Sequence, residues 1–250
     1  MLNIVVPMAG RGSRFAKEGY ELPKPLIDVN GKHMIEVVLN NLKPTCDHRF
    51  IFVCQNEHIE KYDLESLFQN TCNNFEIVGI DGVTDGAAIT VLKAREFFDN
   101  NDPLMIANSD QWVDVDINDY LEDMVSRELQ GSMLTMKASD PKWSFAKVDS
   151  RGLVSEVVEK VVVSDEATVG IYNFSNGANF CKYADYMVSQ DLRSNGEFYV
   201  APVYTFMAQA GESIGVYNVG KEADGMYGLG IPSDLELFLT LDVCKKSTNF

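Results

Sequence analysis

The sequence predicts one α/β domain whose doubly wound, mixed β-sheet carries helices on both faces, a three-layer α/β/α arrangement. Two observations predict this class. Short β-branched apolar runs alternate with helical patterns as far as residue 110, which is typical of parallel strands joined by crossover helices. Beyond residue 130, short strand patterns follow one another with turn signals between them, which favours an antiparallel extension of the same sheet.

The first half of the chain is predicted to alternate strands and helices. Strands are expected at the short apolar runs Leu2–Val6, Phe50–Cys54, Phe75–Ile80 and Leu104–Ala107. Helices are expected where apolar residues recur at helical spacing, at Met34–Leu42, Glu60–Gln69 and Ala87–Phe98. Because the carboxyl ends of parallel strands meet at one edge of such a sheet, we expect the ligand site at that edge.

The second half is predicted to form shorter strands and three further helices. The strands are expected at Gly131–Lys137, Ala146–Asp149, Val154–Glu159 and Thr168–Phe174. The helices are expected at Asp185–Leu192, Pro202–Ala210 and Pro232–Val243. No linker, low-complexity tract or internal repeat interrupts the chain, so residues 1–250 are expected to form a single domain.

Composition excludes several classes of protein. The chain has 37 acidic and 21 basic residues, a net charge of −16, which argues against a nucleic-acid binder and against a protein held on anionic lipid. No apolar run is long enough for a transmembrane helix, and the N-terminus has no secretory pattern. The five cysteines are scattered and the three histidines lack zinc-ligand spacing, so we expect reduced thiols, a cytoplasmic protein and no zinc site.

The most informative segment follows the first strand. Gly10 and Gly12 let the backbone approach an anion, and Arg14 adds a fork of donors for phosphate oxygens. Lys24 stands between two prolines that stiffen its backbone. Residues 1–26 carry a local net charge of +2, which favours a triphosphate site. The loop has neither the Gly-Lys-Ser/Thr of a Walker A motif nor the third glycine of GxGxxG, and the plain alternative is a βα turn with surface cations.

With these residues, the chain resembles the sugar-phosphate nucleotidyltransferases, pyrophosphorylase-like enzymes with a GT-A-like, Rossmann-type fold. The motifs that carry the resemblance, in order, are GxGSRF with PKPL, Thr84–Ala88, Ala107–Asp110, Glu159-Lys160, Gly170–Tyr172, Asn195–Tyr199 and Gly228–Leu235. The resemblance implies a nucleotide-binding half at residues 1–125 and an acceptor-binding half at residues 126–250. It is greatest to small bacterial or phage enzymes of capsule and surface-glycan clusters.

The resemblance implies a role for each matching residue. Arg14, Lys24 and Asp110 would be catalytic, and Asp110 would hold Mg²⁺. The family's second metal carboxylate falls near Gly228, which departs from the pattern, and Asp224, with Glu222 behind it, is the expected substitute. The nucleotide is assigned Met8, Ala9, Gly10, Arg11, Gly12, Ser13, Asp81, Thr84, Gly86, Ala87 and Ser109. The phosphorylated acceptor is assigned Lys147, Glu159, Lys160, Gly170, Glu197 and Tyr199.

The expected reaction joins an NTP to a phosphorylated small molecule, with a sugar 1-phosphate favoured, and releases pyrophosphate. In the family, a Gln ahead of the Gly86-like glycine often serves a uracil or thymine edge, and Asp81 stands there in this chain. A carboxylate only accepts hydrogen bonds, so it suits the cytosine amino group or the guanine N1/N2 edge. CTP is therefore the favoured nucleotide, and the alternative is that Asp81 caps the Asp81-Gly82 turn.

Two other functions stay open. Asp114 and Asp116 have the spacing of the DxD motif of a metal-dependent glycosyltransferase, although the acidic run they begin also favours a helix N-terminus. Loss of the second metal carboxylate at Gly228 would suit a nucleotide sensor without turnover. The partners expected are an NTP and a phosphorylated acceptor, and a homo-oligomer is compatible with the sequence.

Overall fold

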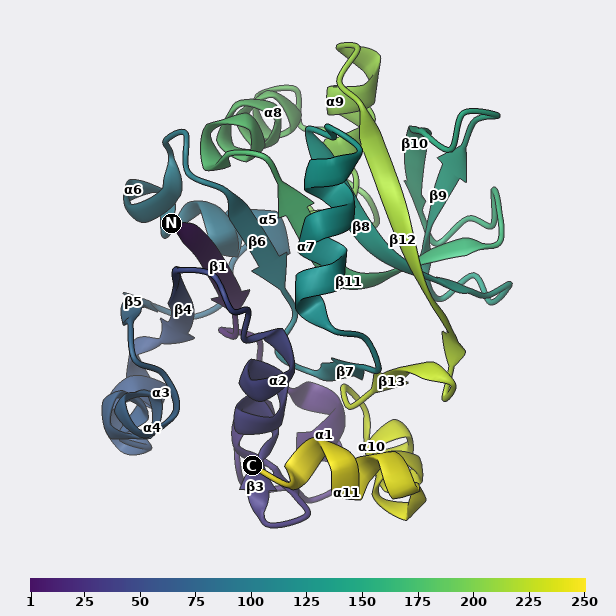
Figure 1. Ribbon diagram of the computed structural model, residues 1–250. Coiled ribbons are helices and arrows are strands. Elements are labelled where there is room, and N and C mark those ends of the chain that lie inside the picture. The colour runs from purple at the N-terminus through teal and green to yellow at the C-terminus, as the bar shows by residue number, and fades with distance from the viewer.

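The computed structural model describes residues 1–250, and a mixed sheet of eleven strands runs through the molecule (Figure 1). Its parallel part consists, in spatial order, of β5 (Phe75–Ile80), β4 (His48–Gln55), β1 (Leu2–Pro7) and β6 (Leu104–Ala107). These are the four strands predicted for the first half, with β4 longer at both ends. Their carboxyl ends meet at one edge, where the predicted phosphate loop follows β1.

The second half extends this sheet, as predicted. β11 (Glu166–Phe174) pairs antiparallel with β6, β8 (Gly131–Lys137) pairs antiparallel with β11, and β12 (Ile214–Glu222) runs parallel to β8. The hairpin of β9 (Ser144–Val148) and β10 (Val154–Glu159) branches from β11 through β9. The remaining strands are β13 (Gly225–Gly228), β7 (Gln111–Val113) and the separate pair β2 (Asp28–Val29) and β3 (Lys32–His33).

Helices cover both faces of the sheet, which confirms the three-layer arrangement. One face carries α5 (Ala87–Leu92), α6 (Arg95–Phe98), α8 (Gly177–Ser189) and α9 (Val203–Gln209). The other face carries α2 (Met34–Leu42), α3 (Asn56–Lys61), α4 (Leu64–Thr71) and α7 (Ile117–Ser126). Each face buries its own cluster, because alternate side chains of a strand point to opposite sides. None of these helices is long and apolar enough to cross a bilayer.

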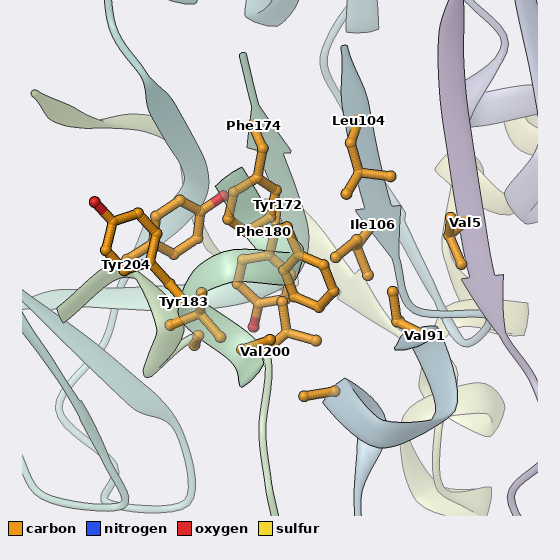
Figure 2. Packing of buried hydrophobic residues seen from close by; sticks show 14 of the residues in the cluster. Val5, Val91, Leu104, Ile106, Tyr172, Phe174, Phe180, Tyr183, Val200 and Tyr204 are labelled. Atoms are coloured by element: carbon orange, nitrogen blue, oxygen red, sulfur yellow. The ribbon is translucent and has the colours of Figure 1, made fainter. Parts of the chain in front are cut away.

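The first of these clusters contains side chains from both halves of the chain (Figure 2). Val5 and Ile106 from the parallel strands pack with Phe174 of β11 and with Tyr204 of α9. The rings of Phe174 and Tyr204 stack with their centroids 4.7 Å apart. The buried core is therefore continuous across the point where the parallel part of the sheet meets its antiparallel extension.

Three predicted helices are interrupted. The predicted helix Glu60–Gln69 is two helices, because Asp63 adopts a left-handed conformation (φ 47°) and its carboxylate accepts a hydrogen bond from the Ser66 amide at the start of α4. The predicted Ala87–Phe98 helix breaks between α5 and α6. The last one divides into α10 (Pro232–Thr240) and α11 (Asp242–Thr248).

A smaller cluster gathers the site segments. It joins Phe15 of α1 (Ser13–Lys17) with Trp112 of β7 and with Phe238 of α10, and it lies beside the 3-10 turn η1 (Lys24–Leu26). Figure 1 shows the C-terminal helices α10 and α11 next to α1, at the lower end of the molecule. The C-terminal segment is thereby brought to the loop that follows the first strand.

Candidate active site

The loop after β1 is held in place by hydrogen bonds to its backbone. The Met8 amide donates to the Val53 carbonyl (2.9 Å), and the buried Gln55 side chain donates through Nε2 to the Ala9 carbonyl (2.8 Å). Met8 and Ala9 are buried, whereas Gly10 and Arg11 are exposed. Gly12 has φ +59°, and a Cβ there would lie 3.3 Å from Lys24 Cβ, so a glycine is needed for the loop and Lys24 to approach so closely.

Lys24 and Asp110, far apart in the sequence, form an ion pair. Lys24 Nζ lies 2.7 Å from Asp110 Oδ2, and the two side chains are 24% and 23% exposed. The Leu229 amide donates to the Asp110 carbonyl (2.8 Å). A Cβ at Gly230 would lie 2.5 Å from Asp110 Oδ2, so this glycine leaves room for the carboxylate. Two of the three predicted catalytic residues are thus in contact.

The third predicted catalytic residue shares a cavity with Asp110. This cavity, called the large cavity below, has a volume of about 620 Å³ and is lined by Arg14, Lys17, Asp110, Lys142, Gly228 and Asp234 among others. The lining carries both signs of charge: a guanidinium, two ammonium groups and three carboxylates, the third from Glu18. An NTP and a metal ion could be neutralised together there.

The expected second metal carboxylate, Asp224, lies away from the large cavity. Asp224 lies on the turn between β12 and β13, is exposed, pairs with Lys221 (3.5 Å), and is not among the residues that line the large cavity. Asp234 lines it instead. A Cβ at Gly228 would lie 3.1 Å from Asp234 Oδ2, so the Asp234 carboxylate lies where a side chain at position 228 would begin. Burial raises the pKa of Asp234, although the nearby Lys142 and a hydrogen bond from Ser233 act to lower it.

The donor set of the large cavity fits Mg²⁺ bound together with a nucleotide. Mg²⁺ prefers oxygen ligands and usually takes one or two carboxylates, with phosphate oxygens and waters completing its shell. Asp110 and Asp234 supply two carboxylates in one cavity. No group of three or more His, Cys, Asp or Glu side chains could hold a metal ion by itself. The arrangement suits a metal ion shared between protein and substrate phosphates.

A second cavity, called the rim pocket, lies beside the loop after β1. Its volume is about 520 Å³ and its lining includes Arg11, Asn56 and Asp81. Asn56 Nδ2 donates to Asp81 Oδ1 (2.8 Å). Asp81, which is predicted to contact the base, and the predicted loop residue Arg11 therefore line the same pocket. Thr84, in contrast, uses its hydroxyl within the chain, because Oγ1 donates to the Gly86 carbonyl (2.9 Å).

Gly86 joins the nucleotide-binding and acceptor-binding halves. Its φ is +124°, and a Cβ would lie 2.5 Å from the Phe198 carbonyl oxygen. The Phe198 amide donates to the Asp85 carbonyl (2.8 Å), and the Ala88 amide donates to the Phe198 carbonyl (3.0 Å). This contact fixes the predicted acceptor segment around Tyr199 against the start of α5.

The small cavity, of about 190 Å³, holds several predicted acceptor residues, with Glu159, Gly170 and Tyr199 in its lining. Ser144 Oγ donates to the Glu159 carboxylate. Gly170 has φ +80° and lies too close to Asn108 for any side chain. Burial, and then the charges of nearby carboxylates, raise the pKa of Tyr199 to about 12, so its hydroxyl stays protonated at neutral pH.

Several predicted residues lie elsewhere than expected. Ala87, which the resemblance assigns to the nucleotide, lines the small cavity instead, and others line none of the three cavities. Ser109 is buried, and Glu197 is exposed beside Tyr199. Lys147 is exposed on β9, and the Lys160 ammonium lies 5.8 Å above the Tyr199 ring, outside the small cavity. The predicted residues that do not line the cavities are Met8, Ala9, Gly10, Gly12, Ser13, Lys24, Thr84, Gly86, Ser109, Lys147, Lys160, Glu197 and Asp224, of which Lys24 contacts the lining residue Asp110.

Three residues that the sequence analysis did not assign line both the large and the small cavity: Asn108, Gln111 and Lys142. Trp143 lines both cavities as well. Lys142 Nζ pairs with Glu222 Oε1 (2.7 Å). Burial acts to lower the pKa of Lys142, but its hydrogen bond to Glu222 and the surrounding carboxylates outweigh it, and the pKa is raised. The available signal was position: Asn108 and Gln111 flank Asp110 closely in the sequence.

The two residues of the alternative DxD motif have other partners. Asp114 pairs with Lys246 of α11. Asp116 caps α7, where its carboxylate accepts a hydrogen bond from the Asn118 amide (2.9 Å). Neither lines the three cavities. The geometry at this position agrees with the helix-start interpretation.

This chain is similar to several known proteins in fold and in sequence. The crystal structure of the nucleoside-diphosphate-sugar pyrophosphorylase from Vibrio cholerae RC9 is similar with a TM-score of 0.81 and 25% identity, covering 95% of this chain and 100% of that chain. The bifunctional protein GlmU of Methanococcus aeolicus is 25% identical over 180 residues, 70% of this chain and 40% of that protein. GlmU of Lactobacillus gasseri is 24% identical over 254 residues, 98% of this chain and 52% of that protein.

The chain thus spans about half, or less, of the length of these curated relatives. Residues 4–198 match the model of a protein family described as "Nucleotidyl transferase", and this match decides the family. That stretch contains the loop after β1, Lys24, Asp110 and most of the lining of the small cavity, and it ends just before Tyr199. By this match and by its fold, the chain belongs to the Nucleotidyl transferase family of enzymes.

Proposed function

We propose that this protein transfers the nucleotidyl group of an NTP to a phosphorylated small molecule, a sugar 1-phosphate in the first instance, and releases pyrophosphate. The observation that carries the proposal is the Lys24–Asp110 pair at the wall of a cavity that also holds Arg14. The large cavity adjoins a small cavity with hydroxyl and carboxylate groups. A charged site for phosphates next to a polar site for a polyol suits the two substrates.

The proposed chemistry needs no nucleophilic side chain. A phosphate oxygen of the acceptor is already anionic, and it attacks the α-phosphorus of the NTP in line with the bond to the leaving pyrophosphate. Catalysis then consists of positioning and charge neutralisation. Arg14 would stabilise the departing pyrophosphate, and Lys24 would bind the α-phosphate as negative charge builds there. Their fixed backbones keep both cations aimed before the substrate arrives.

Lys24 has to exchange partners in this reaction. In the structure it neutralises Asp110, so a phosphate that takes the ammonium leaves the Asp110 carboxylate free. Asp110 and Asp234 are the residues that would hold Mg²⁺, which when bound would neutralise charge on the α-phosphate. The pairing thus keeps each group neutralised until nucleotide and metal enter together. An NDP-sugar-type product would suit a role in capsule or surface-glycan synthesis.

For the base, we propose that Asp81 favours CTP. Asp81 lines the rim pocket, and Asn56 occupies Oδ1, which orients the carboxylate and leaves Oδ2 for a base amino group. The Asp81→Asn variant should lose the preference for CTP over UTP by about tenfold, since a hydrogen bond to a charged group contributes roughly 1.5–3 kcal/mol. The measurement is kcat/KM for each NTP. A wild-type preference for UTP or dTTP would refute the proposed role of Asp81 in selecting CTP.

The reaction itself is tested by a pyrophosphate-release screen of four NTPs against a panel of phosphorylated metabolites. We expect release that depends on one NTP, on Mg²⁺ and on a phosphorylated acceptor. A nucleotide-sugar glycosyltransferase would release no pyrophosphate, and a sensor would bind an NTP without turnover. Either result would replace the proposed function.

A further inference from the structure

Two buried N–H donors at the junction of the large and small cavities have no hydrogen-bond partner. They are Nε2 of Gln111 and Nε1 of Trp143. Gln111 is only 5% exposed, and both side chains line both cavities. An unpartnered buried donor costs about 1–3 kcal/mol, and native proteins keep few of them. Two at the same junction indicate a ligand that accepts hydrogen bonds there.

Lys142 adds a cation at the same junction. It lines both cavities, and its Nζ lies 4.9 Å from the centroid of the Trp143 ring. Its partner in the structure is Glu222, and both side chains of this pair are 44% exposed. An ion pair this exposed contributes little to stability, so the ammonium can turn to a stronger anion at small cost.

An amide N–H, an indole N–H and an ammonium together suit a group that only accepts hydrogen bonds and carries negative charge. A phosphate monoester has both properties. The small cavity beyond the junction differs in character, because Ser144, Thr168 and Tyr199 contribute hydroxyl groups and Glu159 a carboxylate. Such a mixture suits the hydroxyl groups of a polyol. One substrate could therefore place its phosphate group at the junction and its polyol part in the small cavity.

We propose that Gln111, Trp143 and Lys142 bind the phosphate group of the acceptor at this junction, with the rest of the acceptor in the small cavity. This inference rests on the proposed function. Gln111 follows Asp110 directly in the chain, and both line the large cavity. A phosphate held by Gln111 would therefore face the place where the α-phosphate is neutralised.

The assignment differs from that carried over by resemblance, which gave the acceptor phosphate to Lys160 or Lys147. Neither of these lysines lines the large or the small cavity. The Lys160 ammonium lies over the outer ring face of Tyr199, and Lys147 is exposed on β9. The two assignments predict different sensitive lysines, which makes them separable by substitution.

The direct test uses inorganic phosphate as the probe and needs no turnover. The chain has two tryptophans, so in a Trp112→Phe background Trp143 is the one that remains, and its fluorescence reports on the junction. We expect a saturable fluorescence change whose Kd rises at least about tenfold in Gln111→Leu and in Lys142→Met, as for loss of a charge-assisted hydrogen bond. Lys221→Met, which removes an exposed lysine outside the cavities, should leave it unchanged.

Kinetics with the acceptor identified by the pyrophosphate screen complete the test. Gln111→Leu and Trp143→Phe should raise the KM of the acceptor about tenfold or more and leave the KM of the NTP within about twofold. Thermal unfolding confirms that each variant is folded. If Lys160→Met weakens phosphate binding and Gln111→Leu does not, the junction assignment is overturned.

Failure of the proposed function gives a different pattern. Saturable phosphate binding that depends on Gln111, with no pyrophosphate release for any acceptor, supports the junction and refutes the reaction. Pyrophosphate release with an acceptor KM that is insensitive to all three junction residues supports the reaction and refutes the junction.

Discussion

At the scale of single residues, the site is organised by a cation and a carboxylate that neutralise each other. Lys24 is carried by η1 between two prolines, and Asp110 follows β6, so the two segments that meet come from different parts of the chain. The pair is about three-quarters buried, which makes its contact stronger than that of an exposed ion pair. A bound nucleotide with its metal ion must therefore interact with Lys24 and Asp110 more favourably than these two residues interact with each other.

The first prediction concerns the binding of the NTP phosphates by Lys24 and Arg14. Lys24→Ala and Arg14→Ala should each lower kcat/KM by roughly 10²–10³, the scale of losing one aimed electrostatic donor. The fold should persist, because both side chains face the large cavity or its wall and not the core. Steady-state pyrophosphate release measures the effect, with Arg151→Ala, on an exposed turn, as the matched cation control. Kinetics near wild type for both variants would contradict the proposed site.

The second prediction separates the candidate metal carboxylates. Asp110→Asn should abolish Mg²⁺-dependent turnover while NTP affinity is largely retained. Asp234→Asn should raise the Mg²⁺ concentration for half-maximal turnover by roughly 10–100-fold or more. Removal of a residue that only supports a metal ligand already lowers metal affinity by that factor. Asp224→Asn is the matched control, because its carboxylate is exposed and outside the large cavity. Calorimetric titration with Mg²⁺ and NTP tests this without turnover, and a larger effect at Asp224 would restore the original assignment.

Residue-level reasoning from the sequence found the groups that stand in short motifs and missed those that depend on distant contacts. Lys24 and Asp110 were predicted as separate functional residues, and the structure adds that they touch. Asp234 belongs to a motif quoted for its resemblance, but only folding shows its carboxylate beside Gly228. Gln111 carries no motif at all. Its significance comes from burial without a partner, a property that no sequence pattern encodes.

At the scale of elements, strands in the parallel part were predictable because they are short, continuous apolar runs. β12 was missed, since Asn218, Gly220 and Lys221 break any such pattern, and its pairing with β8 places it in the sheet. The break between α3 and α4 was missed for a different reason. The helical apolar spacing continues through Asp63, whose left-handed backbone is a local event that periodicity does not report.

The third prediction belongs to the element contact at Gly86. Gly86→Ala should destabilise the protein by about 2–6 kcal/mol, because a positive φ and overlap with the Phe198 backbone each cost roughly 1–3 kcal/mol. Urea denaturation measures this. Gly211→Ala is the matched control: its φ is +89° with open space around the new Cβ, so only the backbone strain of roughly 1–3 kcal/mol applies. Equal losses in the two variants would contradict the close docking of the Phe198 segment.

At the scale of the whole molecule, residues 1–125 and residues 126–250 share one sheet and one core. β6 of the first half pairs with β11 of the second, and β7 pairs with β13. One buried cluster contains Val5 and Ile106 as well as Phe174 and Tyr204. The phosphate loop and the acceptor segment are thus held by the same sheet and the same core. We therefore keep the prediction of a single domain over residues 1–250.

The last prediction follows from this shared core: the halves unfold together. Each half contains one tryptophan, Trp112 in the first and Trp143 in the second, so Trp143→Phe and Trp112→Phe variants give a fluorescence probe for each half separately. In urea, both probes and the far-UV circular dichroism should give coincident midpoints, the mark of one cooperative transition. A fragment of residues 1–125 should not fold alone, because β6 would lose its neighbour β11 and present an unpaired apolar edge. Two separated midpoints, with Trp112 and Trp143 reporting different transitions, would show instead that the nucleotide-binding and acceptor-binding halves are independent domains.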